Sequence, residues 1–373
     1  MKTFYYSTLV FLILVYLFTY SSKTLSQSSD LEGDNKELII NDNSIKIGTK
    51  QTIALVIEGG YTVERIEIPV SIIRGTQKGS IVCMTGGIHG DELNGIEIVR
   101  RILNQFDPEE VNGTLIGIPI VNIPGFKRGE RYLPDRRDLN RYFPGNPTGS
   151  IASRIAYQIF NEVIKKCDYL VDFHTASFHR SNLPQIRADL QKPQIKNMAI
   201  HFGAPIVIHK PGAKGTLRTS ASDVNIPAII FEAGQPLRLQ MSNITKGVKG
   251  MNALLAHLKV IKIEITSSKT TNAIYLSTKW SRANSGGMIF PKIKSGSLVN
   301  KNDLLAEIID PISNKKSFVY ADSDGMVIGM ALSQIVLPGY AVFHIGLKSS
   351  SKTQESDEQF IENDPIKKEE RVD

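Results

Sequence analysis

His89 and Glu92 are the residues whose types and spacing best fit metal chemistry. They lie in the stretch 81–95, IVCMTGGIHGDELNG, after an apolar run that predicts a buried strand. The glycines at 86–87 end that strand, and apolar residues at helical spacing follow from Ile96. Residues three apart at a helix start can face one point. An imidazole and a carboxylate there predict half of a zinc site at a strand-to-helix corner.

Two further polar residues stand at strand ends. His174 follows the apolar run 169–173, and Glu232 follows the run 228–231. Ligands of open α/β sheets gather at the carboxyl ends of strands. His89, Glu92 and His174 would give one catalytic zinc ion per chain three protein ligands and leave one position open. Glu232 is the candidate general base that takes a proton from water.

The elements that must position these residues alternate between strand and helix as far as residue 260. Short apolar runs predict strands at 52–57, 63–73, 81–84, 113–121, 169–173, 206–208 and 228–231. Helical spacing predicts helices at 96–105, 151–163, 195–202 and 244–258. This alternation is typical of an α/β domain with helices on both faces of a sheet. Between 261 and 347, short alternating strands and glycine turns predict a small all-β domain.

The segment 122–149 is long, irregular and rich in arginine. It has four prolines, and its aromatic and apolar residues argue against disorder. A loop of this length in a compact domain is usually functional. The planar, permanently charged side chain of arginine is well suited to binding carboxylates.

Bulk composition narrows the class of protein. The net charge of +7 over 373 residues is spread along the chain without a dense basic block, so nucleic acid is not an expected partner. Residues 1–26 have the pattern of a signal peptide or an uncleaved N-terminal anchor, so we expect the folded part outside the cytoplasmic membrane. We expect a flexible lead-in at 27–50, a hydrolase domain at 51–260 and a disordered tail at 348–373.

The two cysteines, Cys83 and Cys167, are expected to be small core residues. A disulfide framework is not expected, and neither cysteine is placed like a nucleophile.

Four segments together resemble the succinylglutamate desuccinylase/aspartoacylase family, whose members are relatives of the zinc carboxypeptidases. They are GGIHGDE, RYLPDRRDLNRYFPG, DFHTA and FEAG, in that order. The resemblance covers roughly residues 50–346. It implies a mixed sheet flanked by helices, as in zinc carboxypeptidases, followed by a C-terminal all-β barrel-sandwich domain that borders the mouth of the active site.

The resemblance also implies a role for each matching residue. His89, Glu92 and His174 would bind zinc, and Glu232 would be the base. Arg131 would polarise the scissile carbonyl, while Asn140 and Arg141 would hold a substrate carboxylate. The spacing between Arg131 and the DLNR motif is about two residues longer than in aspartoacylase-like members. Arg137 is therefore a rival for the carbonyl role.

The expected activity is zinc-dependent hydrolysis of an N-acyl amide bond in a small carboxylate-bearing substrate. A zinc carboxypeptidase acting on extracytoplasmic peptides is one alternative, and an exported binding module without turnover is another. The expected partner is a small N-acyl amino acid or a related amide. Membrane contact would come only through an uncleaved N-terminal segment, and the oligomeric state is left open, a homo-oligomer included.

Each site residue also has a structural alternative. His89 and Glu92 could form a capping pair, and His174 could be a satisfied core histidine. Glu232 could pair with an arginine of the long loop. Asp138 and Asp172 are expected to support the ligands rather than bind metal. Trp280 is expected in the β-domain core.

Overall fold

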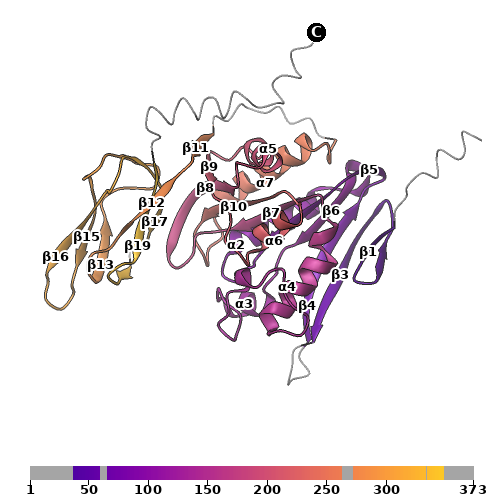
Figure 1. Cartoon of the computed structure of the whole chain (residues 1–373), viewed down its shortest axis with the longest axis horizontal. Coiled ribbons are helices and arrows are strands. Elements are labelled where there is room, and N and C mark those ends of the chain that lie inside the picture. The colour runs from indigo at the N-terminus through magenta and orange to yellow at the C-terminus, as the bar shows by residue number, and fades with distance from the viewer. Residues whose placement is uncertain (1–36, 59–64, 263–271, 333, 348–373) are drawn as a thin grey trace, which may run out of the picture. The chain divides into compact units, whose positions relative to one another are not determined.

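The computed structural model describes residues 37–58, 65–262, 272–332 and 334–347 (Figure 1). The first strands are β1 (Leu38–Ile40), β2 (Asn43–Ile45), β3 (Thr49–Glu58), β4 (Arg65–Arg74), β5 (Gln77–Gly86), β6 (Asn112–Ile118), β7 (Tyr169–His174), β8 (Arg180–Ala188), β9 (Ile206–His209) and β10 (Ala228–Gly234). The later strands are β11 (Ala273–Tyr275), β12 (Thr278–Arg282), β13 (Gly287–Pro291), β14 (Leu298–Val299), β15 (Leu304–Ile309), β16 (Lys316–Tyr320), β17 (Gly325–Ala331), β18 (Ile335–Val336) and β19 (Ala341–Leu347). The helices are α2 (Leu93–Gln105), α3 (Ile123–Arg128), α4 (Ile151–Glu162), α5 (Pro193–His201), α6 (Leu217–Asp223) and α7 (Met241–His257), with 3₁₀ turns η1 (Pro108–Glu110), η2 (Leu139–Arg141) and η3 (Ile164–Lys166).

The predicted mixed α/β sheet is confirmed. Its main path runs β12-β19-β17-β8-β10-β7-β5-β6-β4-β3. Strands β6, β5, β7 and β10 are parallel neighbours, while β8 lies antiparallel to β10. The register pairs Glu232 of β10 with His174 of β7, and Phe173 with Gly86 of β5. The carboxyl ends of three adjacent strands therefore meet at one edge of the sheet.

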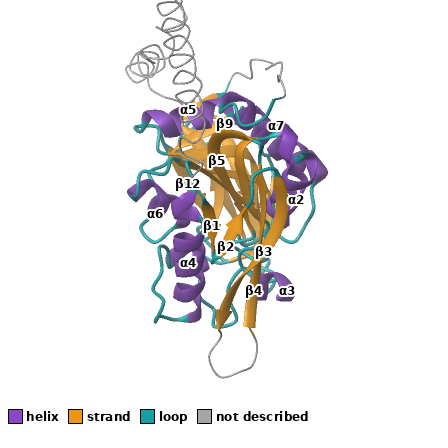
Figure 2. Cartoon of the chain, turned by 90° about the vertical axis from the view of Figure 1, so that its right-hand side faces the viewer, coloured by secondary structure: helices purple, strands orange, loops and turns teal. Residues whose placement is uncertain are grey.

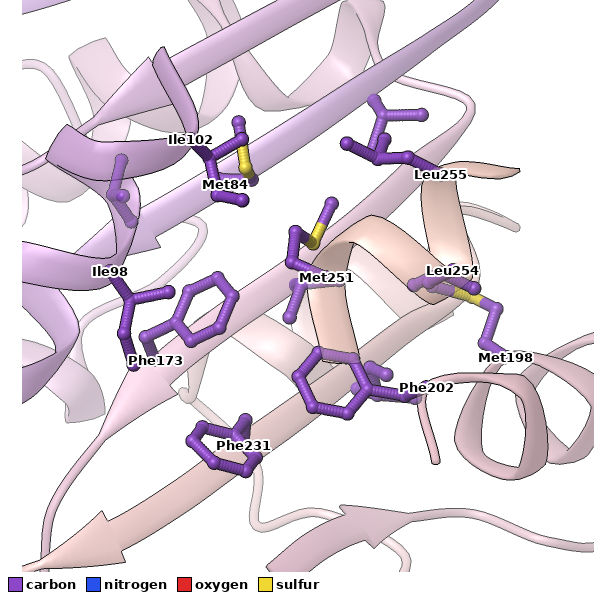
Figure 3. Packing of buried hydrophobic residues seen from close by; sticks show 14 of the residues in the cluster. Met84, Ile98, Ile102, Phe173, Met198, Phe202, Phe231, Met251, Leu254 and Leu255 are labelled. Carbon is purple, nitrogen blue, oxygen red and sulfur yellow. The ribbon is translucent and has the colours of Figure 1, made fainter. Parts of the chain in front are cut away.

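Helices cover both faces of the sheet, as the alternation of elements predicts. Figure 2 shows α4 and α6 on one side and α2 and α7 on the other. The face under α2, α5 and α7 holds a large apolar cluster to which the central strands also contribute (Figure 3). Helix α2 points Ile98 and Ile102 into this cluster, because apolar residues recur along it at helical spacing. The cluster fixes α2 against β5 and β7, so Glu92 at its N-terminus has a set position.

Cys83 of β5 and Cys167, just before β7, form a disulfide. The expectation of two unlinked core cysteines is therefore wrong, although both are buried. The two residues are 84 positions apart in sequence, and only the pairing of β5 with β7 brings their Cα atoms to 5.9 Å. The disulfide joins the two strands whose carboxyl ends lead to His89 and His174.

Removing this disulfide should lower stability. A Cys83→Ala/Cys167→Ala variant is expected to lose about 3–5 kcal/mol of unfolding free energy, because the bond closes a long loop in the unfolded chain. Denaturant titration measures the loss. A reductant should destabilise the wild type by a similar amount and leave the double variant unchanged; a wild type indifferent to reductant would contradict this account.

The C-terminal region is all-β. A four-stranded sheet, β16-β15-β13-β18, has its own apolar core together with β17 and β19. Strand β17 pairs with β8, aligning Ala331 with Arg180, so the main sheet continues from the α/β part into this region. Strand β8 therefore lies between β17 of the β-region and β10 of the α/β part, within one sheet (Figure 1).

Residues 38–45 form a small antiparallel hairpin, β1–β2, that counts as a separate unit. The expected flexible lead-in is wrong for residues 37–50, because this hairpin and the start of β3 occupy them. Asn41 and Asp42 have φ angles of 48° and 60° at the turn, a backbone form that favours two-residue hairpins. The expected N-terminal segment 1–26 and tail 348–373 lie outside the described residues. Within the described chain, no helix has the length and apolar character to span a membrane.

Candidate active site

The corner after β5 places His89 beside Glu92. Gly87 has a φ of 58°, which glycine adopts without strain and which turns the chain at the strand end. Glu92 is the N-cap of α2, one residue earlier than the first-turn position expected from the sequence. Its side chain makes no capping hydrogen bond, so the capping-pair alternative is wrong. Instead, Oε1 of Glu92 lies 2.8 Å from Nδ1 of His89.

His174, at the end of β7, completes the predicted group. Its Nδ1 lies 2.8 Å from Oε2 of Glu92, which also accepts a hydrogen bond from the backbone N–H of Thr175 at 3.0 Å. One ligand atom from each of His89, Glu92 and His174 lies within 4.8 Å of the others, and all three residues are buried. The structure therefore brings together the three metal ligands proposed from the sequence.

Two carboxylates orient the imidazoles from behind. Oδ1 of Asp138 lies 3.1 Å from Nε2 of His89, and Oδ2 of Asp172 lies 2.8 Å from Nε2 of His174. The hydroxyl of Thr85 donates to Asp172 at 2.7 Å and fixes that carboxylate in turn. Carboxylates that hold one ring nitrogen of a histidine leave the other free to bind metal. This is the supporting role expected for Asp138 and Asp172.

The charges of the group fit a bound cation. Burial raises the pKa of Glu92, but His89 and His174 outweigh burial and hold that pKa well below its usual range. Burial lowers the pKa of His174, but Asp172 and Glu92 raise it well above its usual range. Nδ1 of His89 is buried, and its 2.8 Å contact with Oε1 of Glu92 is close but does not have the geometry of a hydrogen bond. Buried carboxylates facing imidazole nitrogens need a shared positive charge, and two nitrogens with one carboxylate are a donor set that zinc accepts.

Removing one orienting carboxylate should weaken metal binding. We expect Asp138→Asn to lower zinc affinity by about 10- to 100-fold, because the amide no longer fixes the ring of His89 as a carboxylate does. Competition with a chromophoric chelator measures the affinity. Asp135→Asn is the matched control, since Asp135 lies in the same loop and pairs with exposed Arg137. Equal affinities for both variants would show that Asp138 does not support the site.

Arg131 reaches this group from the long loop, and Arg137 does not. Nη1 of Arg131 donates to Oε1 of Glu92 at 2.7 Å. Burial lowers the pKa of Arg131, but Glu92 and Asp138 outweigh burial and raise it, so the guanidinium stays charged. The side chain of Arg137 is 43% exposed and pairs with Asp135 at 2.6 Å. The structure thus does not bring Arg137 to the candidate site.

Asn140 and Arg141 lie at the 3₁₀ turn η2. The side-chain oxygen of Asn140 accepts from the backbone N–H of Leu217 at 2.9 Å, which ties the long loop to α6. Arg141 is half exposed, and its Nη2 is 4.0 Å from Oδ2 of Asp138. Both residues line the same cavity as the metal-ligand group.

Glu232 is held by residues that the sequence patterns did not single out. Its Oε2 accepts from Nδ2 of Asn182 at 2.7 Å and lies 2.9 Å from Nη2 of Arg187. Both partners are on β8, so the alternative of a pair with an arginine of the long loop is wrong. Glu232 lines the cavity together with His89 and His174. Its carboxylate is therefore anchored at the wall of the cavity that holds the metal-ligand group.

The cavity has a volume of about 320 Å³ and includes walls that the sequence analysis missed. Strand β8 contributes Arg180 and Arg187, the segment before α6 contributes Lys210, and α6 itself contributes Arg218. Trp280 of β12 also lines it, which corrects its expected place in the β-domain core and agrees with a β-region that borders the site. The indole stacks on His344 with ring centroids 4.4 Å apart. The arginines of RSNLPQIRA were the available signal, but no apolar alternation marks that stretch as a strand.

Comparison with known protein families finds one that part of this chain resembles. A family model described as the succinylglutamate desuccinylase/aspartoacylase catalytic domain matches residues 78–258. That range contains every candidate metal, catalytic and substrate-binding residue predicted from the sequence.

Two curated proteins are similar over shorter stretches. The chain is 31% identical over 149 residues to N-alpha-acetyl-L-2,4-diaminobutyric acid deacetylase of Halomonas elongata, a match covering 38% of this chain and 43% of that protein. It is 36% identical over 76 residues to succinylglutamate desuccinylase of Burkholderia orbicola, covering 20% and 22% respectively. The chain therefore spans less than half the length of the curated relatives that it matches.

Solved structures share the fold over most of the chain. A product-bound ectoine utilization protein from Ruegeria pomeroyi superposes with a TM-score of 0.75 at 23% identity, covering 82% of this chain and 98% of that one. A succinylglutamate desuccinylase/aspartoacylase from Rhodobacter sphaeroides gives a TM-score of 0.72 at 24% identity, covering 81% and 97%. At these identities the likeness establishes a common fold.

Proposed function

We propose, on the premise that residues 78–258 belong to the succinylglutamate desuccinylase/aspartoacylase family, that this chain is a zinc-dependent amidohydrolase. It would cleave an N-acyl amide bond in a small substrate that carries a carboxylate. One observation carries the proposal: the ligand atoms of His89, Glu92 and His174 converge in the same cavity that Glu232 and Arg131 line. The names of the two curated relatives, a deacetylase and a desuccinylase, support the same bond type.

His89, Glu92 and His174 would hold the ion through Nδ1, a carboxylate oxygen and Nδ1, with Asp138 and Asp172 fixing the rings. A zinc ion bound there would supply a Lewis acid that polarises the scissile carbonyl and makes water acidic near neutral pH.

The protein's own groups would carry the proton and the developing charge. Glu232 takes a proton from the attacking water, whose oxygen then bonds to the carbonyl carbon. Arg131 donates to the oxyanion that forms, in a buried place where such donors act strongly. As the C–N bond breaks, Glu232 returns the proton to the leaving amine. Asn182 and Arg187 keep the Glu232 carboxylate in one orientation throughout.

Arg141 and Asn140 would orient the substrate. The guanidinium of Arg141 is half exposed at the cavity and lies 4.0 Å from Asp138, so it can donate hydrogen bonds to a substrate carboxylate. Asn140 would act mainly by fixing the loop through Leu217, because its side-chain oxygen is already bonded there.

A substrate comparison tests this function. We expect the zinc-loaded protein to hydrolyse N-acetyl or N-succinyl amino acids, with chelator-treated protein inactive and zinc restoring the rate. Short peptides of similar length are the opposing substrates, because a carboxypeptidase would prefer them. Faster release of the C-terminal residue from peptides than of amine from N-acyl amino acids would overturn the proposal.

We also propose that the protein acts outside the cytoplasm. The apolar segment near the N-terminus and the Cys83–Cys167 disulfide support this location, since disulfides persist in oxidising compartments. Fractionation of producing cells with thiol labelling tests it. The expected result is protein in the exported fraction with both cysteines unlabelled, and reduced protein in the cytoplasmic fraction would contradict it.

A further inference from the structure

Arg180 is a cavity-lining arginine held in place by the β-region. Its guanidinium carbon lies 4.6 Å from the ring centroid of Tyr340 and 5.2 Å from that of Trp280. Its Nε donates to the backbone oxygen of Ala341 at 2.9 Å. Aromatic rings contact the face of a guanidinium and leave its N–H edge free for an acceptor. Arg180 is therefore oriented before any ligand arrives.

No carboxylate pairs with Arg180 among the residues that the structure describes. Arg218 also lacks a carboxylate partner, but both of its Nη atoms donate to backbone oxygens, those of Arg187 and Pro211. Arg131 pairs with Glu92, and Arg187 pairs with Glu232. Arg180 has only its backbone and aromatic contacts. Burial lowers the pKa of Arg180, and the positive charges of Arg282 and Arg131 lower it further. An anion bound beside Arg180 would compensate the positive charge of its guanidinium.

The cavity as a whole has more positive than negative side chains. Its described lining includes the cations Arg131, Arg141, Arg180, Arg187, Lys210 and Arg218. The carboxylates in the same lining are Glu92 and Glu232. A substrate with a single carboxylate, bound at Arg141, would leave most of these positive side chains without a negative partner. The charge balance favours a substrate with more than one anionic group.

We propose that Arg180 is a specificity-determining residue that binds a second carboxylate of the substrate, distinct from the carboxylate assigned to Arg141. This inference rests on the proposed function. The second carboxylate can belong to the acyl group, as in a succinyl amide, or to the side chain of the amino acid. In both cases Trp280 and Tyr340 act as positioning residues, because they hold the guanidinium that makes the contact.

Kinetics with three substrates test the proposal. N-acetylalanine has one carboxylate, N-succinylalanine has a second on the acyl side, and N-acetylglutamate has a second on the amine side. We expect Arg180→Gln to lower kcat/KM by about 10- to 100-fold for one of the two dicarboxylates and by less than about twofold for N-acetylalanine. The dicarboxylate whose kcat/KM falls shows whether Arg180 binds a carboxylate of the acyl group or one of the amino acid. Equal losses for all three substrates would overturn the proposal.

Two further variants exclude indirect explanations. Arg282→Gln is the matched control, because Arg282 is an exposed cation near Arg180 that lies outside the cavity lining and donates to the backbone of Gly339. It should leave the substrate preference unchanged. Arg180→Lys keeps the charge and should restore part of the preference. A selective loss in Arg282→Gln as large as that in Arg180→Gln would also overturn the proposal.

Binding without turnover separates this inference from the proposed function. Calorimetry with the zinc-loaded protein compares succinate with propionate, which differ by one carboxylate. The wild type should prefer succinate, and Arg180→Gln should lose that preference by about 10-fold or more. If the preference depends on Arg180 although no amide is hydrolysed, the hydrolase proposal fails and the role of Arg180 stands. If amides are hydrolysed but neither assay depends on Arg180, the role of Arg180 fails alone.

Discussion

Replacing Glu232 by glutamine should lower kcat by about 10²- to 10⁴-fold and leave zinc binding unchanged. The amide has the same shape but cannot take a proton from water. Glu232 is not among the three residues whose ligand atoms converge, so its loss removes no metal ligand. Its contact with Asn182 can persist through the remaining oxygen. The expected result is thus a folded, metal-loaded and nearly inactive protein.

Steady-state kinetics and metal content, measured on the same sample, check this expectation. Glu97→Gln is the control, because Glu97 is a carboxylate on α2 that pairs with Arg100 outside the cavity lining. Its kcat should match the wild type within about twofold. A Glu232→Gln variant with undiminished kcat would remove Glu232 from the mechanism. A variant that loses its zinc would instead identify Glu232 as a ligand.

Replacing Arg131 by glutamine should lower kcat/KM by about 10²- to 10³-fold, whereas Arg137→Gln should have little effect. Arg131 is the buried, permanently charged donor beside Glu92, so its loss removes stabilisation of the oxyanion. Arg137 is exposed and already paired with Asp135. The sequence left both residues as candidates for this role, and the two variants decide between them.

Kinetics of both variants with one N-acyl amino acid provide the measurement. Because Arg131 also pairs with Glu92, zinc content and unfolding midpoint must be compared with the wild type. An Arg131→Lys variant keeps the charge without the planar fork and should recover only part of the rate. If Arg137→Gln were the more damaging change, the assignment would be reversed.

The metal-ligand group could be predicted from sequence because its two histidines lie at or just after the ends of recognisable strands and Glu92 begins the helix that follows the first of them. Residues at the carboxyl ends of adjacent parallel strands must lie close together, whichever helices cover the sheet. His89 lies just after β5 and His174 ends the neighbouring strand β7, and Glu232 is in register with His174. Local patterns were therefore sufficient to predict which residues meet.

The outer wall of the cavity could not be predicted in this way. Strand β8 contains Pro184 and two buried polar residues, Asn182 and Gln185, so it lacks the apolar alternation of a half-buried strand. The side chain of Asn182 donates to Glu232 and lines the cavity instead of facing water. Trp280 has the composition of a core residue, and only the pairing of β17 with β8 brings its region to the site.

Long-range pairing also explains the missed disulfide. Two cysteines 84 positions apart give no local signal, and their contact depends on the order of strands in the sheet. In contrast, the hairpin at 38–45 had a local signal that was overlooked. Asn41-Asp42, directly after the apolar residues 38–40, is a pair that favours a tight two-residue turn.

The most direct test of the proposed metal site is the zinc content of the purified protein, measured by atomic emission after excess zinc has been removed by gel filtration. The wild type should hold about one zinc ion per chain, and His89→Ala and His174→Ala should each hold almost none while Asp135→Asn keeps the full amount. A wild type that stays free of metal after exposure to excess zinc, or alanine variants that retain it, would show that His89 and His174 do not bind zinc.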